Sequence, residues 1–118
     1  EKHIPPQHIL DKLIQPHSSF LNEVLEIDKS YTITGMCHIT GGGLTENLKR
    51  IIPSDLFLNL NNIEFPDWCE WLKRNGDLSD SEMKKIFNCG IGYIVFIRPL
   101  SVNLDIKNAI YLGNVEKI

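Results

Sequence analysis

The sequence has few cysteines, no long hydrophobic run and no excess of basic charge. Its three cysteines, Cys37, Cys69 and Cys89, are widely spaced and form no C-x-x-C pair. This spacing argues against a disulfide framework or a zinc site and favours a reducing compartment. No apolar stretch approaches the roughly 18 residues of a membrane span, and no signal peptide is visible. With a net charge of −3, neither nucleic acid nor a membrane is expected as partner, and we expect a cytoplasmic protein.

The composition is that of one globular domain. The chain has 118 residues, of which 42% are hydrophobic and 23% charged, enough to bury a core without disulfides or metal. It begins at Glu1, in a polar stretch that contains two prolines, rather than at a methionine. We therefore expect a single domain over residues 1–118 that is a piece of a longer protein.

Helices and strands are both predicted along the chain. Helical spacing of apolar residues, with start and stop signals, predicts helices at 9–14, 20–25, 44–52, 66–76 and 80–87. Apolar and β-branched runs predict strands at 31–39, 56–60, 93–97 and 108–115, the last with 109–112 as its apolar part. The run 93–97 is apolar on both faces, which predicts a central buried strand. Together the elements predict an α+β fold, a mixed β-sheet layered with α-helices.

Two predicted helices carry capping signals at their starts. Ser79 and Glu82 have the spacing of a capping box. Ser18 or Ser19 is expected to cap the helix that follows them.

The most informative feature is the run Thr40, Gly41, Gly42 and Gly43, where a predicted strand ends and a predicted helix begins. Three consecutive glycines are entropically costly, so they indicate a tight turn or close approach by a ligand. A glycine turn before a helix directs free N–H groups outward, which favours a phosphate or another anionic group. The alternative is a purely structural turn without a ligand.

The usual nucleotide-binding patterns do not fit this turn. A P-loop needs a lysine directly after its last glycine, and here Leu44 follows Gly43. A dinucleotide fingerprint needs a third glycine at the position that Glu46 occupies. The glycines alone therefore leave both the anion-binding and the structural interpretation open.

The residues around the turn are more specific. The segment 38–47 (HITGGGLTEN) with Arg50 and Pro53 closely resembles a signature of phosphoribosylformylglycinamidine cyclo-ligase, also called aminoimidazole ribonucleotide synthetase. A second segment, 87–92 (FNCGIG), resembles another signature of that family. Two long motifs in the family's order identify the chain as similar to the C-terminal domain of this family, over roughly residues 9–115.

The resemblance implies a function and a set of partners. The family uses ATP, with Mg²⁺, to close the imidazole ring of formylglycinamidine ribonucleotide, which gives aminoimidazole ribonucleotide, ADP and phosphate in purine biosynthesis. An N-terminal domain that is absent here supplies most of the ATP site and the homodimer contact. The resemblance therefore implies that this chain works together with its own N-terminal domain and is inactive alone.

Several residues of the two signatures are candidates for the site. His38 is the candidate catalytic residue, because an imidazole can transfer a proton or steady a phosphoryl oxygen; the alternative is a hydrogen-bonded strand histidine. Thr40, Gly41, Gly42, Gly43 and Asn47 are the candidate substrate- and phosphate-binding residues.

Structural roles are the alternative to ligand binding for these residues. Thr40 is alternatively a helix cap, and Asn47 alternatively ties down the turn. Glu46 is expected to support the helix N-terminus. Asn88 and Gly90 are expected to shape the entry to the strand 93–97, and Cys89 to be a packed small residue rather than a nucleophile.

No metal site is expected on this chain, and His3, His8 and His17 form no ligand constellation. Trp68 and Trp71 are expected to be core or domain-contact aromatics.

The sequence departs from the family in two places. The arginine of a Pro-Thr-Arg-like segment is absent from residues 15–20, and the stretch 98–108 is too short for the family's usual helix. Two alternatives therefore stay open. One is a related ATP-using enzyme, such as formylglycinamidine ribonucleotide synthetase, selenophosphate synthetase or thiamine-monophosphate kinase. The other is a non-catalytic binding domain of the same fold.

Overall fold

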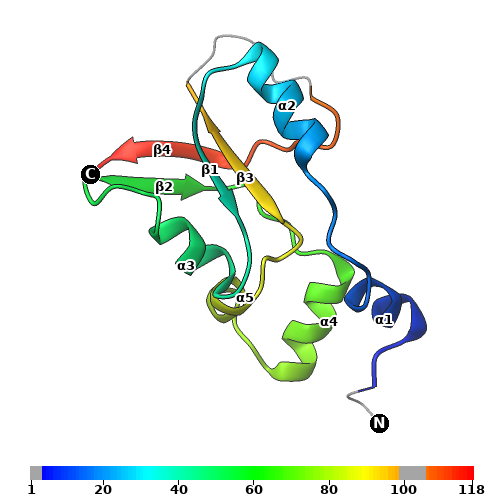
Figure 1. Ribbon diagram of the computed structural model, residues 1–118. Helices are drawn as coiled ribbons and strands as arrows, with labels where there is room; N and C mark the ends of the chain where they lie inside the picture. Colours follow the sequence, from blue (N-terminus) through cyan, green and yellow to red (C-terminus); the bar gives the residue numbers. More distant parts are fainter. Residues whose placement is uncertain (1–3, 99–105) are drawn as a thin grey trace.

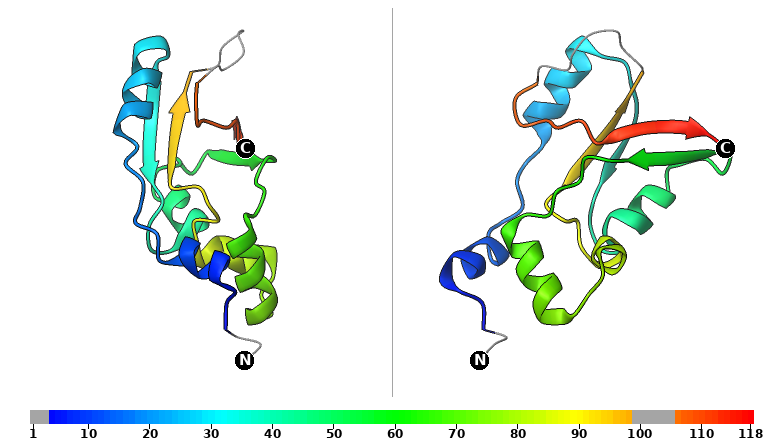
Figure 2. Two further views of the ribbon diagram at one scale, coloured as in Figure 1. Left: turned by 90° about the vertical axis from the view of Figure 1, so that its right-hand side faces the viewer. Right: turned by 180° about the vertical axis from the view of Figure 1, so that it is seen from behind.

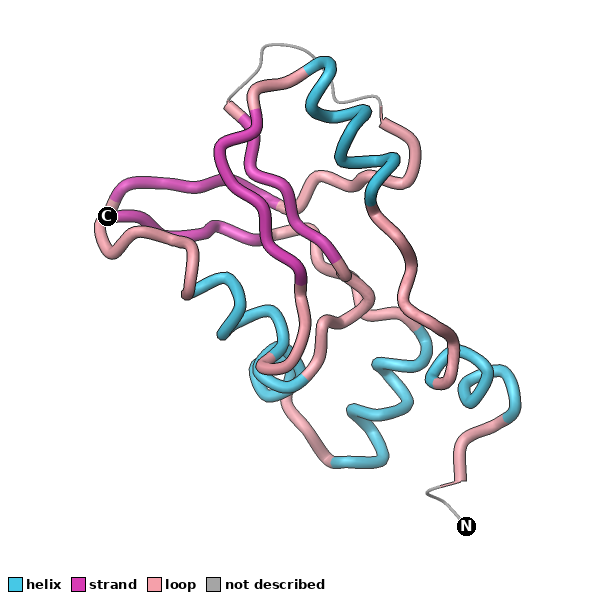
Figure 3. The backbone as a smooth tube through the Cα atoms, in the orientation of Figure 1, coloured by secondary structure: helices cyan, strands magenta, loops and turns pink. Residues whose placement is uncertain are grey.

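The computed structural model describes residues 4–98 and 106–118 (Figure 1). Most of the stretch 98–108, which is too short for the helix usual in the family, lies outside these residues. The elements, coloured by type in Figure 3, are helices α1 (Gln7–Leu13), α2 (Leu21–Ser30), α3 (Gly43–Lys49), α4 (Asp67–Gly76) and α5 (Asp80–Ile86), and strands β1 (Ile33–His38), β2 (Leu56–Leu60), β3 (Tyr93–Ile97) and β4 (Gly113–Lys117). No helix among the described residues has the length and apolar character that a bilayer crossing requires.

The described strands form two antiparallel pairs. β1 pairs with β3, with Cys37 opposite Ile94 and His38 opposite Tyr93. β2 pairs with β4. Figure 2 (left) shows α2 on one side of the β1–β3 pair and the β2–β4 pair on the other. Helices α3, α4 and α5 gather at the end of β1 that carries His38 (Figure 1). The predicted α+β class is confirmed.

The prediction that 93–97 is a central strand is wrong for the described part of the chain. Among the described strands β3 hydrogen-bonds to β1 alone, and Ile94 is its one buried residue. Ile94 and Phe96 pack against the core, whereas Tyr93, Val95 and Ile97 are half-buried on the opposite face. The apolar run correctly indicated that both faces of the strand are covered. The second strand pair covers one face and a helix the other (Figure 2), so this covering does not require a second neighbouring strand among the described residues.

The last strand begins later than the sequence predicted. β4 is Gly113–Lys117, while Ile110 and Tyr111 lie outside it and are 67% and 53% exposed. The pairing with β2 sets the strand, because Leu60 lies opposite Gly113 at the start of the register. A Cβ atom on Gly113 would lie 1.9 Å from the Asn59 carbonyl oxygen, so the backbones approach too closely for a side chain.

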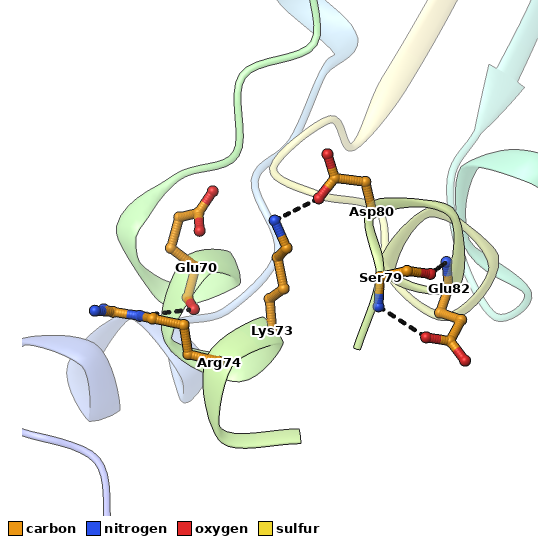
Figure 4. Close-up of polar contacts among 6 residues, drawn as sticks. All are labelled: Glu70, Lys73, Arg74, Ser79, Asp80 and Glu82. Atoms are coloured by element: carbon orange, nitrogen blue, oxygen red, sulfur yellow. Dashed lines mark hydrogen bonds and ion pairs between the residues drawn. The ribbon is translucent and has the colours of Figure 1, made fainter. Parts of the chain in front are cut away.

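One of the two predicted caps is confirmed. The Ser79 hydroxyl accepts from the Glu82 N–H at 3.1 Å, and the Glu82 carboxylate accepts from the Ser79 N–H at 2.7 Å, a complete capping box at the start of α5 (Figure 4). Helix α2, however, follows Phe20 with no side-chain cap, so the predicted role of Ser18 or Ser19 is wrong. Instead, Phe20, the residue that precedes α2, is positioned by aromatic contacts with the rings of His38 and Tyr93.

An ion pair joins α4 to α5. Lys73 binds Asp80, as Figure 4 shows. The hydrogen bond between them raises the pKa of Lys73 and lowers the pKa of Asp80. Both groups are close to water, which screens the attraction, so the pair contributes more to the relative position of the two helices than to stability.

The core lies where β1, β3 and helices α3 to α5 meet. Its buried members are Cys37, Ile39, Leu44, Leu48, Cys69, Met83, Cys89 and Ile94. All three cysteines belong to it and are free. In α4 the most buried side chain is Cys69, and Trp68 and Leu72 are partly buried against the core. The predicted packing role of Cys89 is therefore confirmed, because its side chain is 1% exposed.

Candidate functional site

The glycine turn joins β1 to α3 through a backbone that requires glycine. Gly42 has a φ of +96° and Gly43 a φ of +65°, values that other residues adopt only with strain. Gly42 precedes the first turn of α3, and no side chain caps this helix. The capping alternative for Thr40 is therefore wrong. Its backbone carbonyl oxygen instead accepts a hydrogen bond from the Gly43 N–H at 3.1 Å.

Close contact with the end of α5 gives Gly43 a packing role. A Cβ atom on Gly43 would lie 2.5 Å from the Lys84 carbonyl oxygen and 2.7 Å from that of Phe87. The Leu44 N–H donates to the same Phe87 oxygen at 3.3 Å, and the Ile39 N–H donates to the Gly92 oxygen at 2.9 Å. The two signature segments, far apart in the sequence, are therefore bonded to each other through their backbones.

These bonds restrict what the turn can offer an anion. The N–H groups of Gly43 and Leu44 already have protein acceptors, so they are not free donors. Gly41 is different, because it is exposed and a Cβ atom there would meet no atom within 4 Å. Of the three glycines, Gly41 is the one for which packing in the described structure gives no reason to exclude a side chain.

Asn47 holds the turn from inside. The residue is 4% exposed. Its side-chain amide donates to the carbonyl oxygens of Thr40, Gly41 and Gly43 at 3.1, 3.2 and 2.7 Å. Its Oδ1 atom accepts from Arg50 at 3.4 Å. The geometry supports the interpretation that Asn47 ties down the turn, since its buried amide nitrogen bonds three backbone carbonyl oxygens of the turn.

A cavity of about 470 Å³ opens beside the turn. It brings together four of the predicted site residues: His38, Thr40, Gly41 and Asn88. The other candidates, Gly42, Gly43, Glu46, Asn47 and Gly90, do not line it. Glu46 is exposed and pairs with Lys49 at 3.5 Å, as expected of a residue in the first helical turn. We call this space the turn cavity.

His38 projects from the last position of β1 and is exposed. Its ring packs edge-on against Phe20, with centroids 6.4 Å apart, and lies 5.8 Å from the ring of Tyr93. Among the described residues its nitrogen atoms make no hydrogen bond. Aromatic packing thus orients the imidazole and leaves both nitrogens available to a ligand, unlike the hydrogen-bonded strand histidine that was the alternative.

Asn88 and Gly90 shape a strained turn beside the cavity. The Asn88 Oδ1 atom accepts from the Gly90 N–H at 2.9 Å, which leaves the side-chain amide nitrogen as a donor. Between them Cys89 has a φ of +56°, a left-handed conformation that is costly for a residue with a side chain. A Cβ atom on Gly90 would lie 3.0 Å from Pro66, so Gly90 lets the loop before α4 approach.

The buried thiols are not arranged as nucleophiles. Burial raises the pKa of Cys37, and the Arg50 charge opposes this effect. A hydrogen bond between the Cys69 and Cys89 side chains, together with burial, raises the pKa of Cys69. The same bond lowers the pKa of Cys89, but its side chain is almost fully enclosed.

Two residues of the turn cavity, His17 and Trp68, were not among the predicted site residues. His17 and Trp68 both line it, together with the end of α1 and the end of α5. Trp68 was expected to be a core or domain-contact aromatic. His17 was set aside because it belongs to no metal-ligand pattern, and no sequence signal brought it near His38. Only the folded chain places the segment before α2 beside the glycine turn.

Curated relatives of this chain are phosphoribosylformylglycinamidine cyclo-ligases. The one from Nitrosospira multiformis is 39% identical over 93 residues, which cover 77% of this chain and 26% of the relative. Those from Xanthomonas oryzae pv. oryzae and Xylella fastidiosa are 40% identical over 106 and 98 residues, each covering 80% of this chain. They are covered over 31% and 28% of their own length, so the chain spans less than a third of these relatives.

A family match covers most of the chain. The family described as AIR synthase related protein, C-terminal domain, matches residues 15–101. This span includes both signature segments and nearly all of the residues that line the turn cavity. With the similarity to the cyclo-ligases over more than three quarters of its length, the chain belongs to the AIR synthase related protein, C-terminal domain family.

Proposed function

We propose that this chain is the C-terminal part of an ATP-dependent cyclo-ligase that converts formylglycinamidine ribonucleotide into aminoimidazole ribonucleotide, ADP and phosphate. The observation that carries the proposal is the turn cavity, where the two signature segments meet and four of the predicted site residues line one space. The names of the relatives support the same reaction.

The polar wall of the cavity suits a phosphorylated ligand. The Thr40 hydroxyl, the Gly41 backbone and the free Asn88 amide are neutral donors that can surround phosphoryl oxygens without a large charge of their own. Gly42, Gly43 and Asn47 act behind this wall by fixing the turn. Fixed donors stabilise charge on phosphoryl oxygens because they need no reorganisation during the reaction.

His38 is the proton-transferring residue in this proposal. Ring closure joins the amidine nitrogen to the activated formamide carbon, and phosphate leaves as that nitrogen loses a proton. A neutral imidazole held by Phe20 and Tyr93 can accept this proton if the nitrogen comes within hydrogen-bond reach. An imidazolium would instead steady a phosphoryl oxygen.

ATP and Mg²⁺ belong to the proposal as cofactors of the whole enzyme. Among the described residues, no three His, Cys, Asp or Glu side chains gather as metal ligands. No lysine or arginine in the described part of the chain lines the turn cavity either. The described residues therefore do not fit a Mg²⁺ or triphosphate site, and no step is assigned to either on this chain. We assign these groups to an N-terminal domain of the same protein and expect no activity from the chain alone. The whole enzyme is proposed to be a cytoplasmic homodimer.

The test uses a full-length enzyme that carries this chain as its C-terminal part. Wild-type enzyme should form aminoimidazole ribonucleotide from formylglycinamidine ribonucleotide and ATP. The His38→Asn variant should lose about 10²-fold or more in kcat, the usual contribution of a positioned acid or base. His8→Asn, an exposed change on α1 away from the cavity, should match wild type. Absence of ring closure in wild type would refute the function, and unchanged turnover of His38→Asn would refute the role of His38.

A further inference from the structure

The turn cavity has a second imidazole on its wall. This imidazole belongs to a residue outside both signature segments. His17 lines the cavity together with His38, Thr40 and Gly41. Its side chain is exposed and, within the described part of the chain, forms no hydrogen bond or ion pair. Both of its ring nitrogens are therefore available to a ligand.

Two anchors fix the segment that carries His17. On one side, α1 packs on α4, with Ile9 4% exposed, and Leu13 at the end of α1 reaches the cavity. On the other side, Phe20 lies over Gly92, where a Cβ atom would come within 2.5 Å of the Phe20 ring. The connection from Leu13 to Phe20 is short, so His17 is held at the cavity rim by the packing of both its ends.

The remaining lining sets the chemistry that His17 would meet. The apolar wall is formed by Leu13, Ile39, Trp68, Leu72, Ile86 and Phe87. Within residues 4–98 and 106–118, no acidic or basic side chain other than the two histidines contributes to the lining. An anionic ligand group therefore meets no carboxylate of the described residues in the cavity. Imidazole N–H groups are then the strongest donors that the cavity wall can offer to it.

We propose that His17 is a phosphate-binding residue of this site, donating an N–H to a phosphoryl oxygen held between it and the Thr40–Gly41 backbone. The identity of the substrate rests on the proposed function, whereas the contact between His17 and a phosphate group is independent of it. The phosphoryl oxygen belongs either to the 5′-phosphate of the ribonucleotide or to the phosphoryl group that ATP supplies.

Binding and kinetics of the full-length enzyme test this contact separately. Calorimetric titration with ribose 5-phosphate should give a Kd about 10-fold weaker for His17→Ala than for wild type, the size of one charge-assisted hydrogen bond. Binding of ribose should be the same in both. His17→Arg should restore ribose 5-phosphate affinity, because the guanidinium is also a donor and carries a permanent charge. His8→Ala is the matched control and should behave as wild type.

The kinetic arm identifies which phosphate is bound. A roughly 10-fold higher KM of His17→Ala for formylglycinamidine ribonucleotide, with unchanged kcat and KM for ATP, assigns the contact to the 5′-phosphate. A change in the KM for ATP alone assigns it to the transferred phosphoryl group. If His17→Ala matches His8→Ala in both arms, or wild type binds no ribose 5-phosphate and no KM changes, the inference is wrong. If wild type does not close the ring yet His17→Ala weakens ribose 5-phosphate, the proposed function fails and the phosphate contact stands.

Discussion

Replacement of Gly43 by alanine tests whether the glycine turn is built by packing or by ligand contact. The new methyl group would lie 2.5 Å from the Lys84 oxygen, 2.7 Å from the Phe87 oxygen and 2.9 Å from the Phe87 nitrogen. All three are backbone atoms, so no side chain can rotate away. The φ of +65° adds a separate penalty, because a Cβ atom is disfavoured in the left-handed region.

The expected loss follows from these two effects. The left-handed backbone costs alanine about 1–2 kcal/mol, and overpacking against a fixed backbone costs about 1–3 kcal/mol. Movement of α5 away from the turn would also break the hydrogen bond from Leu44 to Phe87, worth about 1 kcal/mol. Gly43→Ala should therefore lower the free energy of unfolding by about 3–6 kcal/mol, a large part of what a domain of this size has.

Urea denaturation, followed by tryptophan fluorescence, measures this effect. With an m-value of about 1–3 kcal/mol per M, the midpoint of Gly43→Ala should fall by about 2 M. Gly41→Ala is the matched control, since its methyl group meets no atom within 4 Å, and its midpoint should stay within about 0.3 M of wild type. Equal midpoints for the two variants would refute the argument that contact with α5 requires Gly43.

Three further predictions concern the supports of the site. Asn47→Ala should lower the free energy of unfolding by about 2 kcal/mol, because the hydrogen bonds from its buried amide to the Thr40, Gly41 and Gly43 oxygens are lost; an unchanged urea midpoint would show that water replaces them. Ser79→Ala should lower it by about 1 kcal/mol through loss of the cap on α5, and a midpoint equal to that of Ser81→Ala, a neighbour outside the capping box, would contradict this. Hydrogen bonds from the Ser79 backbone and hydroxyl lower the pKa of Glu82. The contribution of the ionised Glu82 carboxylate to the free energy of unfolding is therefore complete above about pH 4.3 and is lost as the pH falls through the folded-state pKa. Urea midpoints at pH 7 and pH 3 should therefore differ less for Glu82→Gln than for wild type, with the exposed Glu26→Gln as control; an equal difference would refute the shift.

Local signals predicted most of the elements correctly. The Ser79 and Glu82 pair predicted the start of α5 because a capping box depends on neighbours within one turn. The ends of β4 could not be predicted in the same way. Ile110 and Tyr111 have strand-forming side chains, but the backbone of β2 pairs with the residues after them. Pairing across the sheet is a property of two distant segments, and composition of one segment does not contain it.

The candidate site likewise has features that local sequence predicts and features that depend on contacts between distant segments. The sequence by itself determined the glycine turn, the two signature segments and the candidate residues His38, Thr40, Gly41 and Asn88, because each belongs to a continuous motif. Only the tertiary structure decided which glycine packs against α5 and which one faces open space. It also placed His17 beside the turn, since that position depends on α1 packing on α4 and on Phe20 packing on Gly92. Contacts between distant segments assign these roles, and they exist only after the chain has folded.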